Sequence, residues 1–201
     1  MARIKLTEEF KKAISILSGK EKDKLLFRLL AKEEILVKQL TFRLLESDTS
    51  VEEKREELAQ TIRKNIEYAD ETFYSPGYLL LDLRSISGLI NRHLKVTKDK
   101  YGEIELNFLM LNYSFELLHQ QLKAFTFPKK RSFADYVAKR GMKLIKLLQK
   151  LHEDYQLDFR DDMKQLGRYI SSDPECMKMA IYHGLNVNWL TRAEIPDPEE
   201  M

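Results

Sequence analysis

Residues 103–125 read EIELNFLMLNYSFELLHQQLKAF and carry the most regular apolar pattern in the chain. Apolar side chains recur every three or four residues, the spacing of a buried seam along an α-helix. That seam consists of Ile104, Phe108, Leu111, Phe115, Leu118, Leu122 and Phe125. A second apolar group on nearly the opposite side consists of Leu106, Leu109, Met110, Tyr113 and Leu117. A helix that is apolar on two faces is expected at the centre of a fold, where neighbouring helices cover both faces.

The composition of the whole chain also favours helices. Of its 201 residues, 43% are hydrophobic and 33% are charged, and seven are glycine and five proline. Runs rich in Val, Thr and Ile, which are typical of strands, are almost absent. We therefore predict an all-α fold, either a single-domain antiparallel helical bundle or an irregular array of helix hairpins, with about seven helices. The domain is expected to cover residues 1–190, and residues 191–201 are expected to form an acidic, frayed tail.

Capping residues predict where several helices begin. Ser18 with Glu21, and Ser50 with Glu53, have the spacing of a capping box. Pro128, followed by a serine at position 132, predicts a boundary before a long helix. The expected longer helices cover residues 51–70, 76–96, 103–125 and 133–155, and two shorter ones cover residues 159–170 and 174–183.

Two nearly identical segments, LLFRLL at 25–30 and LTFRLL at 40–45, raise the question of whether one helix or two cover this region. In one continuous helix, at about 100° per residue, both segments would share a face whose middle is Glu33. An unpaired carboxylate would be costly to bury there. We therefore expect a break at residues 31–34. A continuous helix in which Glu33 has a buried partner is the alternative.

The order of this region, SGKEKDKLLFRLLAKEEILVKQLTFRLLE at residues 18–46, resembles the opening of an uncharacterised bacterial family of all-helical proteins of about 200 residues. In that family a short leucine-rich helix precedes a second helix, which ends in an aromatic-containing Leu-Arg segment. The resemblance implies a helical fold. It implies no site residues, because the family has no assigned activity.

Positive charge is concentrated between Lys123 and Lys150, where nine basic residues accompany one acidic residue, Asp135. The candidate partner-binding residues in this stretch are Lys129, Lys130, Arg131, Lys139, Arg140, Lys143, Lys146 and Lys150. Four of these lysines, at positions 139, 143, 146 and 150, fall within an arc of about 60° on one helix. The simplest interpretation is a solvated helix face. An acidic protein partner or self-association is the functional interpretation, and nucleic acid is a third possibility.

A second candidate is the pair Glu116 and His119, which has the E-x-x-H spacing that bundle proteins use to bind two metal ions. Asn112 and Glu105 lie on the same side of the predicted helix, and Glu33 could supply a further ligand. However, a site for two metal ions needs a second E-x-x-H pair, and the sequence has none. An internally satisfied polar strip is therefore the alternative to a metal-dependent enzyme, and we expect no cofactor.

The spacing of Glu53 and Glu56, with Glu67 and Asp70, is similar to the magnesium-binding pairs of all-helical nucleotide pyrophosphohydrolases. In those enzymes the two pairs lie on separate helices that converge on the metal. Here both pairs fall on one predicted helix, about 20 Å apart, so that they could not share an ion. An exposed helix with charge pairs is the alternative.

The remaining chemistry-bearing residues are four histidines on four successive predicted helices and a single cysteine, Cys176. One cysteine excludes an intramolecular disulfide and is typical of a reducing compartment. The sequence has no apolar segment of signal-peptide or membrane-spanning length. We therefore predict a cytoplasmic, non-enzymatic protein that acts by protein–protein interaction through the basic helix face.

Overall fold

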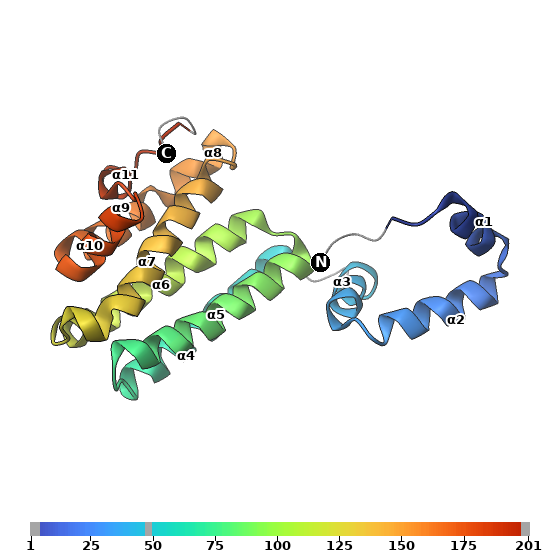
Figure 1. Cartoon of the computed structure of the whole chain (residues 1–201), viewed down its shortest axis with the longest axis horizontal. Coiled ribbons are helices and arrows are strands. Elements are labelled where there is room, and N and C mark those ends of the chain that lie inside the picture. The colour runs from blue at the N-terminus through green and yellow to red at the C-terminus, as the bar shows by residue number, and fades with distance from the viewer. Residues whose placement is uncertain (1–4, 47–49, 198–201) are drawn as a thin grey trace. The chain divides into compact units, whose positions relative to one another are not determined.

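The computed structural model describes residues 5–46 and 50–197 of the chain. These residues form α-helices and one short 3-10 helix, with no strand among them, which confirms the all-α prediction (Figure 1). The elements are α1 (Glu8–Ile16), α2 (Gly19–Leu30), α3 (Glu34–Leu44), α4 (Val51–Glu71), α5 (Pro76–Thr97), α6 (Lys100–Lys123), α7 (Phe127–Leu148), α8 (Glu153–Gln156), η1 (Leu157–Phe159), α9 (Arg160–Ser172), α10 (Pro174–Tyr182) and α11 (Val187–Thr191). The helices outnumber the expected seven because the chain includes several short ones.

The chain divides into two units, residues 1–47 and residues 48–201. One domain over residues 1–190 was expected from the sequence. The division falls in the polar segment between α3 and α4, where the serine, aspartate and threonine residues favour a linker.

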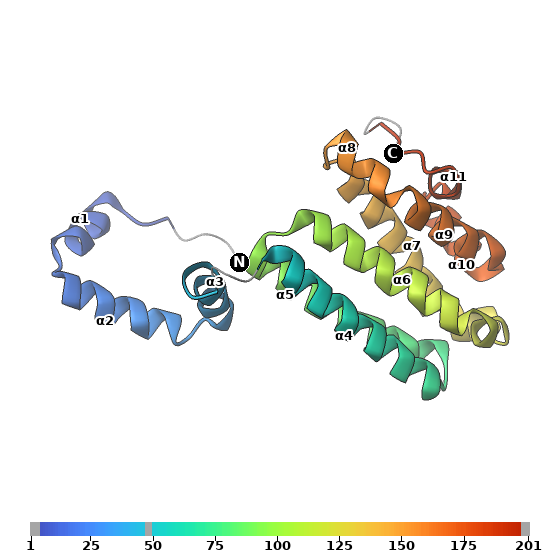
Figure 2. The same ribbon diagram turned by 180° about the vertical axis from the view of Figure 1, so that it is seen from behind.

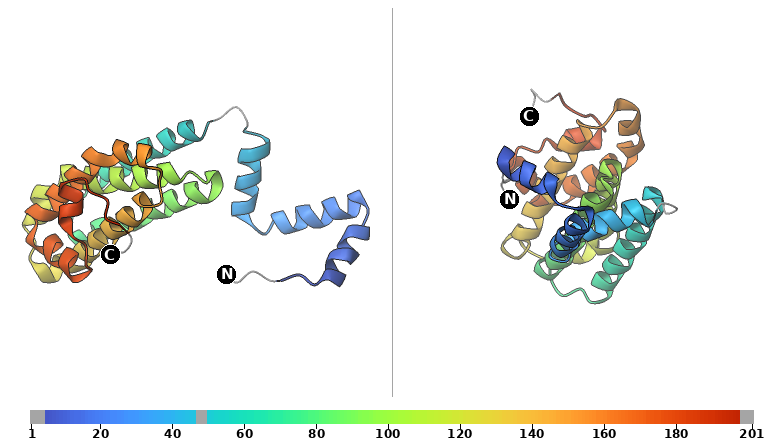
Figure 3. Two further views of the ribbon diagram at one scale, coloured as in Figure 1. Left: turned by 90° about the horizontal axis from the view of Figure 1, so that it is seen from above. Right: turned by 90° about the vertical axis from the view of Figure 1, so that its right-hand side faces the viewer.

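The first unit consists of α1, α2 and α3. Ser18 and Glu21 form the predicted capping box at the start of α2, with the Ser18 N–H donating to Glu21 Oε2 at 2.9 Å. The predicted break is confirmed, because α2 ends at Leu30 and α3 begins at Glu34 (Figure 3, left). Glu33 occupies the N-cap position of α3 and is exposed, so no buried partner is needed. None of the residues of these three helices is buried.

The second unit is built around α6. This helix packs against α4, α5, α7 and α9, and Figure 2 shows α4 and α5 alongside it. Both apolar groups of the central helix contribute to the core: Ile104 and Phe108 on the seam are buried, as are Leu106 and Met110 on the other side. The predicted central position is therefore confirmed. α10 packs on α7 and α9, and α11 packs on α9.

Among the predicted helices, α7 differs most from its expected bounds. α7 was expected at residues 133–155, but it begins at Phe127 and ends at Leu148. Thr126 is its N-cap residue and Pro128 lies in its first turn, where proline is favoured because the N–H groups of that turn have no helical partner. Pro128 therefore begins this helix. α11 was not predicted at all, although its Val187 and Leu190 are buried.

The described part of the expected tail, residues 191–197, belongs to the second unit and contacts its core. Ile195 lies against the hydrophobic core, and the carbonyl of Pro196 accepts a hydrogen bond of 2.7 Å from Gln149 Nε2. These contacts hold a segment that was expected to fray. The last four residues of the chain lie outside the described part.

Within the described ranges, no helix has the length and apolar character needed to cross a bilayer.

Candidate functional site

The lysine row on α7 is partly neutralised by acidic residues from the same unit. Lys143 Nζ lies 2.6 Å from an oxygen of Glu103, whose side chain is only 7% exposed. Lys139 Nζ lies 2.8 Å from Asp135. Lys146 and Lys150 are exposed and make no ion pair within residues 5–46 and 50–197. Two of the four lysines in the predicted row, Lys146 and Lys150, are therefore exposed positive charges without an ion pair in the described part of the chain.

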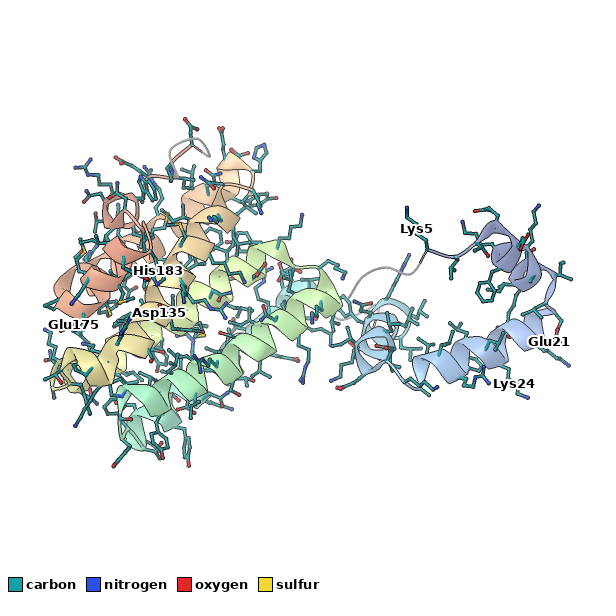
Figure 4. All side chains as sticks on the ribbon, viewed as in Figure 1. Lys5, Glu21, Lys24, Asp135, Glu175 and His183 are labelled. Atoms are coloured by element: carbon teal, nitrogen blue, oxygen red, sulfur yellow. The ribbon has the colours of Figure 1, made fainter. Side chains whose placement is uncertain are left out.

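Asp135 joins α7 to the residue that follows α10. One carboxylate oxygen pairs with Lys139. The other lies 2.7 Å from His183 Nε2, and Figure 4 labels Asp135 and His183. Desolvation, the largest influence on this carboxylate, acts to raise its pKa, but the hydrogen bonds from Lys139 and His183 and their charges together lower the pKa of Asp135. His183 therefore links the end of α10 to α7, whereas the pair of Lys139 with Asp135 lies within α7.

The other candidate basic residues fall into two groups. Lys130 was predicted to lie on the surface, but it is 2% exposed and forms an ion pair with the buried Asp173. Arg140 donates to Asn107 Oδ1 at 3.3 Å and lies over the ring of Tyr136. Lys129 and Arg131 are exposed, with no ion partner among the residues that the structure describes. The prediction for Lys130 is wrong because its acidic partner is 43 positions away in the sequence.

The proposed metal ligands do not come together. Glu116 is exposed on α6, and His119 Nε2 lies 3.2 Å from Ser172 Oγ. Desolvation, followed by the charge of Lys123, lowers the pKa of His119. Glu33 belongs to the first unit. In the described part of the chain, no three His, Cys, Asp or Glu side chains are grouped so that they could hold a metal ion.

The four histidines have separate partners. His93 lies 3.2 Å from Asp99, and His152 lies 3.3 Å from Asp154 on the surface. The other two contact Ser172 and Asp135, as described above. The histidines therefore form four local contacts rather than one site.

The two acidic pairs that resemble magnesium ligands lie on one continuous helix, α4, as the sequence predicted. Arg55 on the same helix contacts acidic residues of the central helix and its N-cap. Its guanidinium donates to Asp99 Oδ2 and to Glu105 Oε2, both at 2.9 Å. The arginine also lies over the ring of Tyr101, at 4.9 Å from the centroid. These contacts fix α4 against α6.

A polar pocket of about 270 Å³ lies beside this network, between α4, α6 and α9. Its polar walls include Glu56, Arg63, Glu105, Asn112, Glu116 and Asp162. The sequence placed Glu105, Asn112 and Glu116 on one strip of α6, and the structure shows that this strip lines the pocket. Asp162 was missed, because only tertiary packing brings α9 to this strip.

Comparisons of the chain with protein-family models, with curated proteins and with solved structures returned no match. We therefore infer function from the contacts and charges of its own residues. The resemblance of residues 18–46 to a bacterial family stays a prediction.

Proposed function

We propose that this chain acts by protein–protein binding, and that residues 5–46 bind the same segment of a second copy. The observation that supports this proposal is the complete absence of buried residues from α1, α2 and α3, all of which are described. The large apolar side chains exposed on this unit are Leu6, Phe10, Ile14, Ile16, Leu25, Leu26, Phe27, Leu29, Leu36, Val37, Leu44 and Leu45. An apolar surface of this extent is typical of an interaction site.

The size of the first unit explains why it needs a partner. A segment of fewer than about 50 residues buries too little apolar surface to be stable without a disulfide, a metal ion or association with another chain. The single cysteine, Cys176, lies in the second unit, so a disulfide within the first unit is excluded. No metal-binding group occurs among the described residues. Association with another chain supplies such stability, since each large apolar side chain contributes about 1.5–3 kcal/mol when fully buried.

Two observations favour a second copy as the partner. Every copy carries the same apolar faces, so a symmetric pair buries both sets at once. The first turns of α2 also carry charges of both signs in alternation, KEKDK at residues 20–24, so a second copy meets opposite as well as like charges. Residues 5–46 contain ten basic and seven acidic residues, a small excess that opposes pairing only weakly.

A hollow of about 400 Å³ at the α1–α2 junction could receive an apolar side chain of the second copy. Leu17 and Leu25 form its apolar walls, while Glu21, Lys24 and Arg28 lie at its polar edge. Figure 4 labels Glu21 and Lys24 on α2. Such a combination of an apolar centre and a charged edge is typical of protein interfaces.

Sedimentation velocity of the full chain over a hundredfold concentration range would test the proposal. The informative variant replaces Phe27 and Leu29 with serine, and its control replaces Leu81 and Leu157 of the second unit with serine. All four side chains are 58–67% exposed, so neither pair of substitutions should disturb the core. We expect the native chain and the control to associate equally and the Phe27→Ser, Leu29→Ser variant to remain monomeric.

Three results would overturn the proposal: a native chain that is monomeric throughout, a variant that associates as tightly as the native chain, or a monomer that instead binds phospholipid vesicles. The last result would show that the apolar faces meet lipid rather than protein. A cytoplasmic location is part of the proposal, because the single cysteine fits a reducing compartment.

The basic residues of α7 are a second candidate contact, for an acidic protein surface. Lys146 and Lys150 support it, because both are exposed and lack an acidic partner in the part of the chain that is described. A Lys146→Glu, Lys150→Glu variant should lose salt-sensitive binding to an immobilised polyglutamate probe, whereas Lys139→Glu should lose less, because Lys139 is already paired with Asp135. A gel shift with DNA at low salt, without polyglutamate binding, would assign the surface to nucleic acid instead.

A further inference from the structure

The last described residues of the chain are fixed beside the C-terminal end of α7. Ala193, which has a φ of 53°, turns the chain after α11. Ile195 then packs on the hydrophobic core, and the carbonyl of the buried Pro196 accepts a hydrogen bond of 2.7 Å from Gln149 Nε2. These contacts place residue 196 next to Gln149, which is the C-cap residue of α7.

Gln149 lies between two exposed lysines near the end of α7. Lys146 precedes it by three positions, so the two side chains start about 5–6 Å apart on the helix. Lys150 follows it directly in the sequence. Neither lysine has an ion pair within residues 5–46 and 50–197. The hydrogen bond from Gln149 therefore brings the end of the chain to two exposed positive charges.

The residues that follow Pro196 carry charge of the opposite sign. Positions 197–200 read DPEE, with three carboxylates and no basic residue. Asp197 is exposed and has no ion pair in the described part of the chain. Glu199 and Glu200 come two and three residues later. Three negative charges therefore follow a fixed point that lies next to two positive charges.

The length of this acidic segment suits the distance to the lysines. An extended chain advances by at most about 3.6 Å per residue, so residues 197–200 reach about 14 Å from residue 196. The long side chains of lysine and glutamate add to this reach. Because the segment belongs to the same chain, its effective concentration at the lysines is on the order of millimolar. A separate acidic molecule at lower concentration competes with it poorly.

We infer that residues 197–200 bind to Lys146 and Lys150 of the same chain, with Asp197, Glu199 and Glu200 supplying the carboxylates. The inference is independent of self-association by the first unit, because all these residues belong to the second unit. An acidic partner would have to displace the segment before it could bind the lysines. This effect on a partner rests on the second candidate contact proposed above for α7.

Zero-length cross-linking of the full chain with a carbodiimide would test the inference. The reagent joins a lysine amine to a carboxylate as an amide where the two groups are in contact, and it takes up the water that is lost as a urea. We expect mass spectrometry to find Lys146 or Lys150 joined to residues 197–200 at low salt. Sodium chloride at roughly 0.5 M should reduce these cross-links about fivefold or more.

Lys129 is the matched control for the cross-linking. It is exposed and has no ion partner among the described residues, but it lies about 25 Å from Lys146 along α7. The inference would be overturned by an absence of cross-links from residues 197–200 to Lys146 and Lys150, or by equal yields at Lys129. Cross-links that join two copies in a mixture of unlabelled and isotope-labelled chains would also overturn it.

Binding to immobilised polyglutamate tests the competition. Glu199→Gln, Glu200→Gln should bind polyglutamate about threefold more tightly than the native chain or better, because two competing carboxylates are lost. Glu57→Gln, Glu71→Gln removes the same charge from exposed positions of α4 and should change the affinity by less than about twofold.

Equal affinities of the native chain and the Glu199→Gln, Glu200→Gln variant would overturn the inference. Equal tightening in both variants would also overturn it, because net charge alone would then explain the change. Cross-links to Lys146 and Lys150 without any binding of polyglutamate would support the inference and overturn only the second candidate contact.

Discussion

The ammonium group of Lys130 contacts the carboxylate of Asp173 in the interior of the second unit, where the two side chains are 3% and 1% exposed. Asp173 is also the N-cap residue of α10, because its Oδ1 accepts from the N–H groups of Glu175 and Cys176, both at 3.1 Å. The Asp173 carboxylate therefore caps α10 and also forms an ion pair with a lysine of α7. This relationship explains why a lysine within a basic stretch is structural.

Replacing Lys130 with methionine should lower the free energy of unfolding by about 3–5 kcal/mol, because it leaves the Asp173 charge buried without a partner. Lys129→Met changes the neighbouring exposed residue and should alter stability by less than about 0.5 kcal/mol. Urea denaturation would measure the free energy of unfolding of both variants and of the native chain. Equal, small effects would show that the buried ion pair does not hold α7 to α10.

Gly167 allows α9 and α11 to approach each other closely. A Cβ atom at this position would lie 2.7 Å from the backbone nitrogen of Thr191, which cannot move without displacing α11. Gly167→Ala should therefore destabilise the protein by about 1–3 kcal/mol. Gly88→Ala is the matched control: a Cβ there meets nothing within 4 Å on an exposed part of α5, and it should stabilise by about 0.5–1 kcal/mol. Thermal unfolding of the two variants should shift in opposite directions, and a shift in the same direction would contradict the packing at Gly167.

Asp99 should make stability depend on acid pH. Desolvation acts to raise its pKa, but hydrogen bonds from His93 and from the Gly102 N–H, together with the charge of Arg55, lower the pKa of Asp99 below its ordinary value. A lowered folded-state pKa contributes stability that is present above the unfolded value of about 3.9 and is lost as pH falls through the folded value.

Asp99→Asn should therefore be less stable than the native chain at neutral pH, and the difference should narrow below about pH 4. Urea titrations at a series of pH values would measure the difference in the free energy of unfolding between this variant and the native chain. Glu57→Gln, at an exposed position, should show a small difference that changes little with pH. A difference for Asp99→Asn that stays constant down to the lowest pH would rule out this carboxylate as a source of acid sensitivity.

Cys176 should be unreactive in the folded protein, although it lies in the first turn of a helix. It is fully buried, and desolvation, followed by the charge of Asp173, raises the pKa of its thiol. A thiol-specific reagent should modify Cys176 only at the rate of unfolding, whereas a cysteine introduced by Ser132→Cys at an exposed position should react at once. Fast modification of Cys176 in the native chain would contradict the packing of α10.

The sequence predicted those features that depend on local spacing. The two apolar groups of residues 103–125 placed that helix at the centre, and the phase of Glu33 located the break between α2 and α3. The reason given for that break was incomplete, because the face around Glu33 is exposed rather than buried. The start of α7 was missed, although Thr126 followed by Pro128 is typical of a helix N-terminus.

The features that depend on tertiary contacts could not be predicted in the same way. Spacing shows that Lys143 belongs to a lysine row, but not that Glu103 lies beside it. The polar strip of α6 was recognised, whereas its position in a pocket with Asp162 depends on how α9 packs. Charge and periodicity identify the helix face on which a residue lies. Identifying the residue that it contacts across that face requires the tertiary structure.

Amide hydrogen exchange of the full chain at low and at high protein concentration tests self-association by the first unit most directly. The proposal predicts that amides of α1, α2 and α3 exchange more slowly at high concentration, because pairing buries their apolar faces, while amides of α4 to α11 exchange at unchanged rates. Exchange in residues 8–44 that does not depend on concentration, or slowing confined to the second unit, would contradict the proposal.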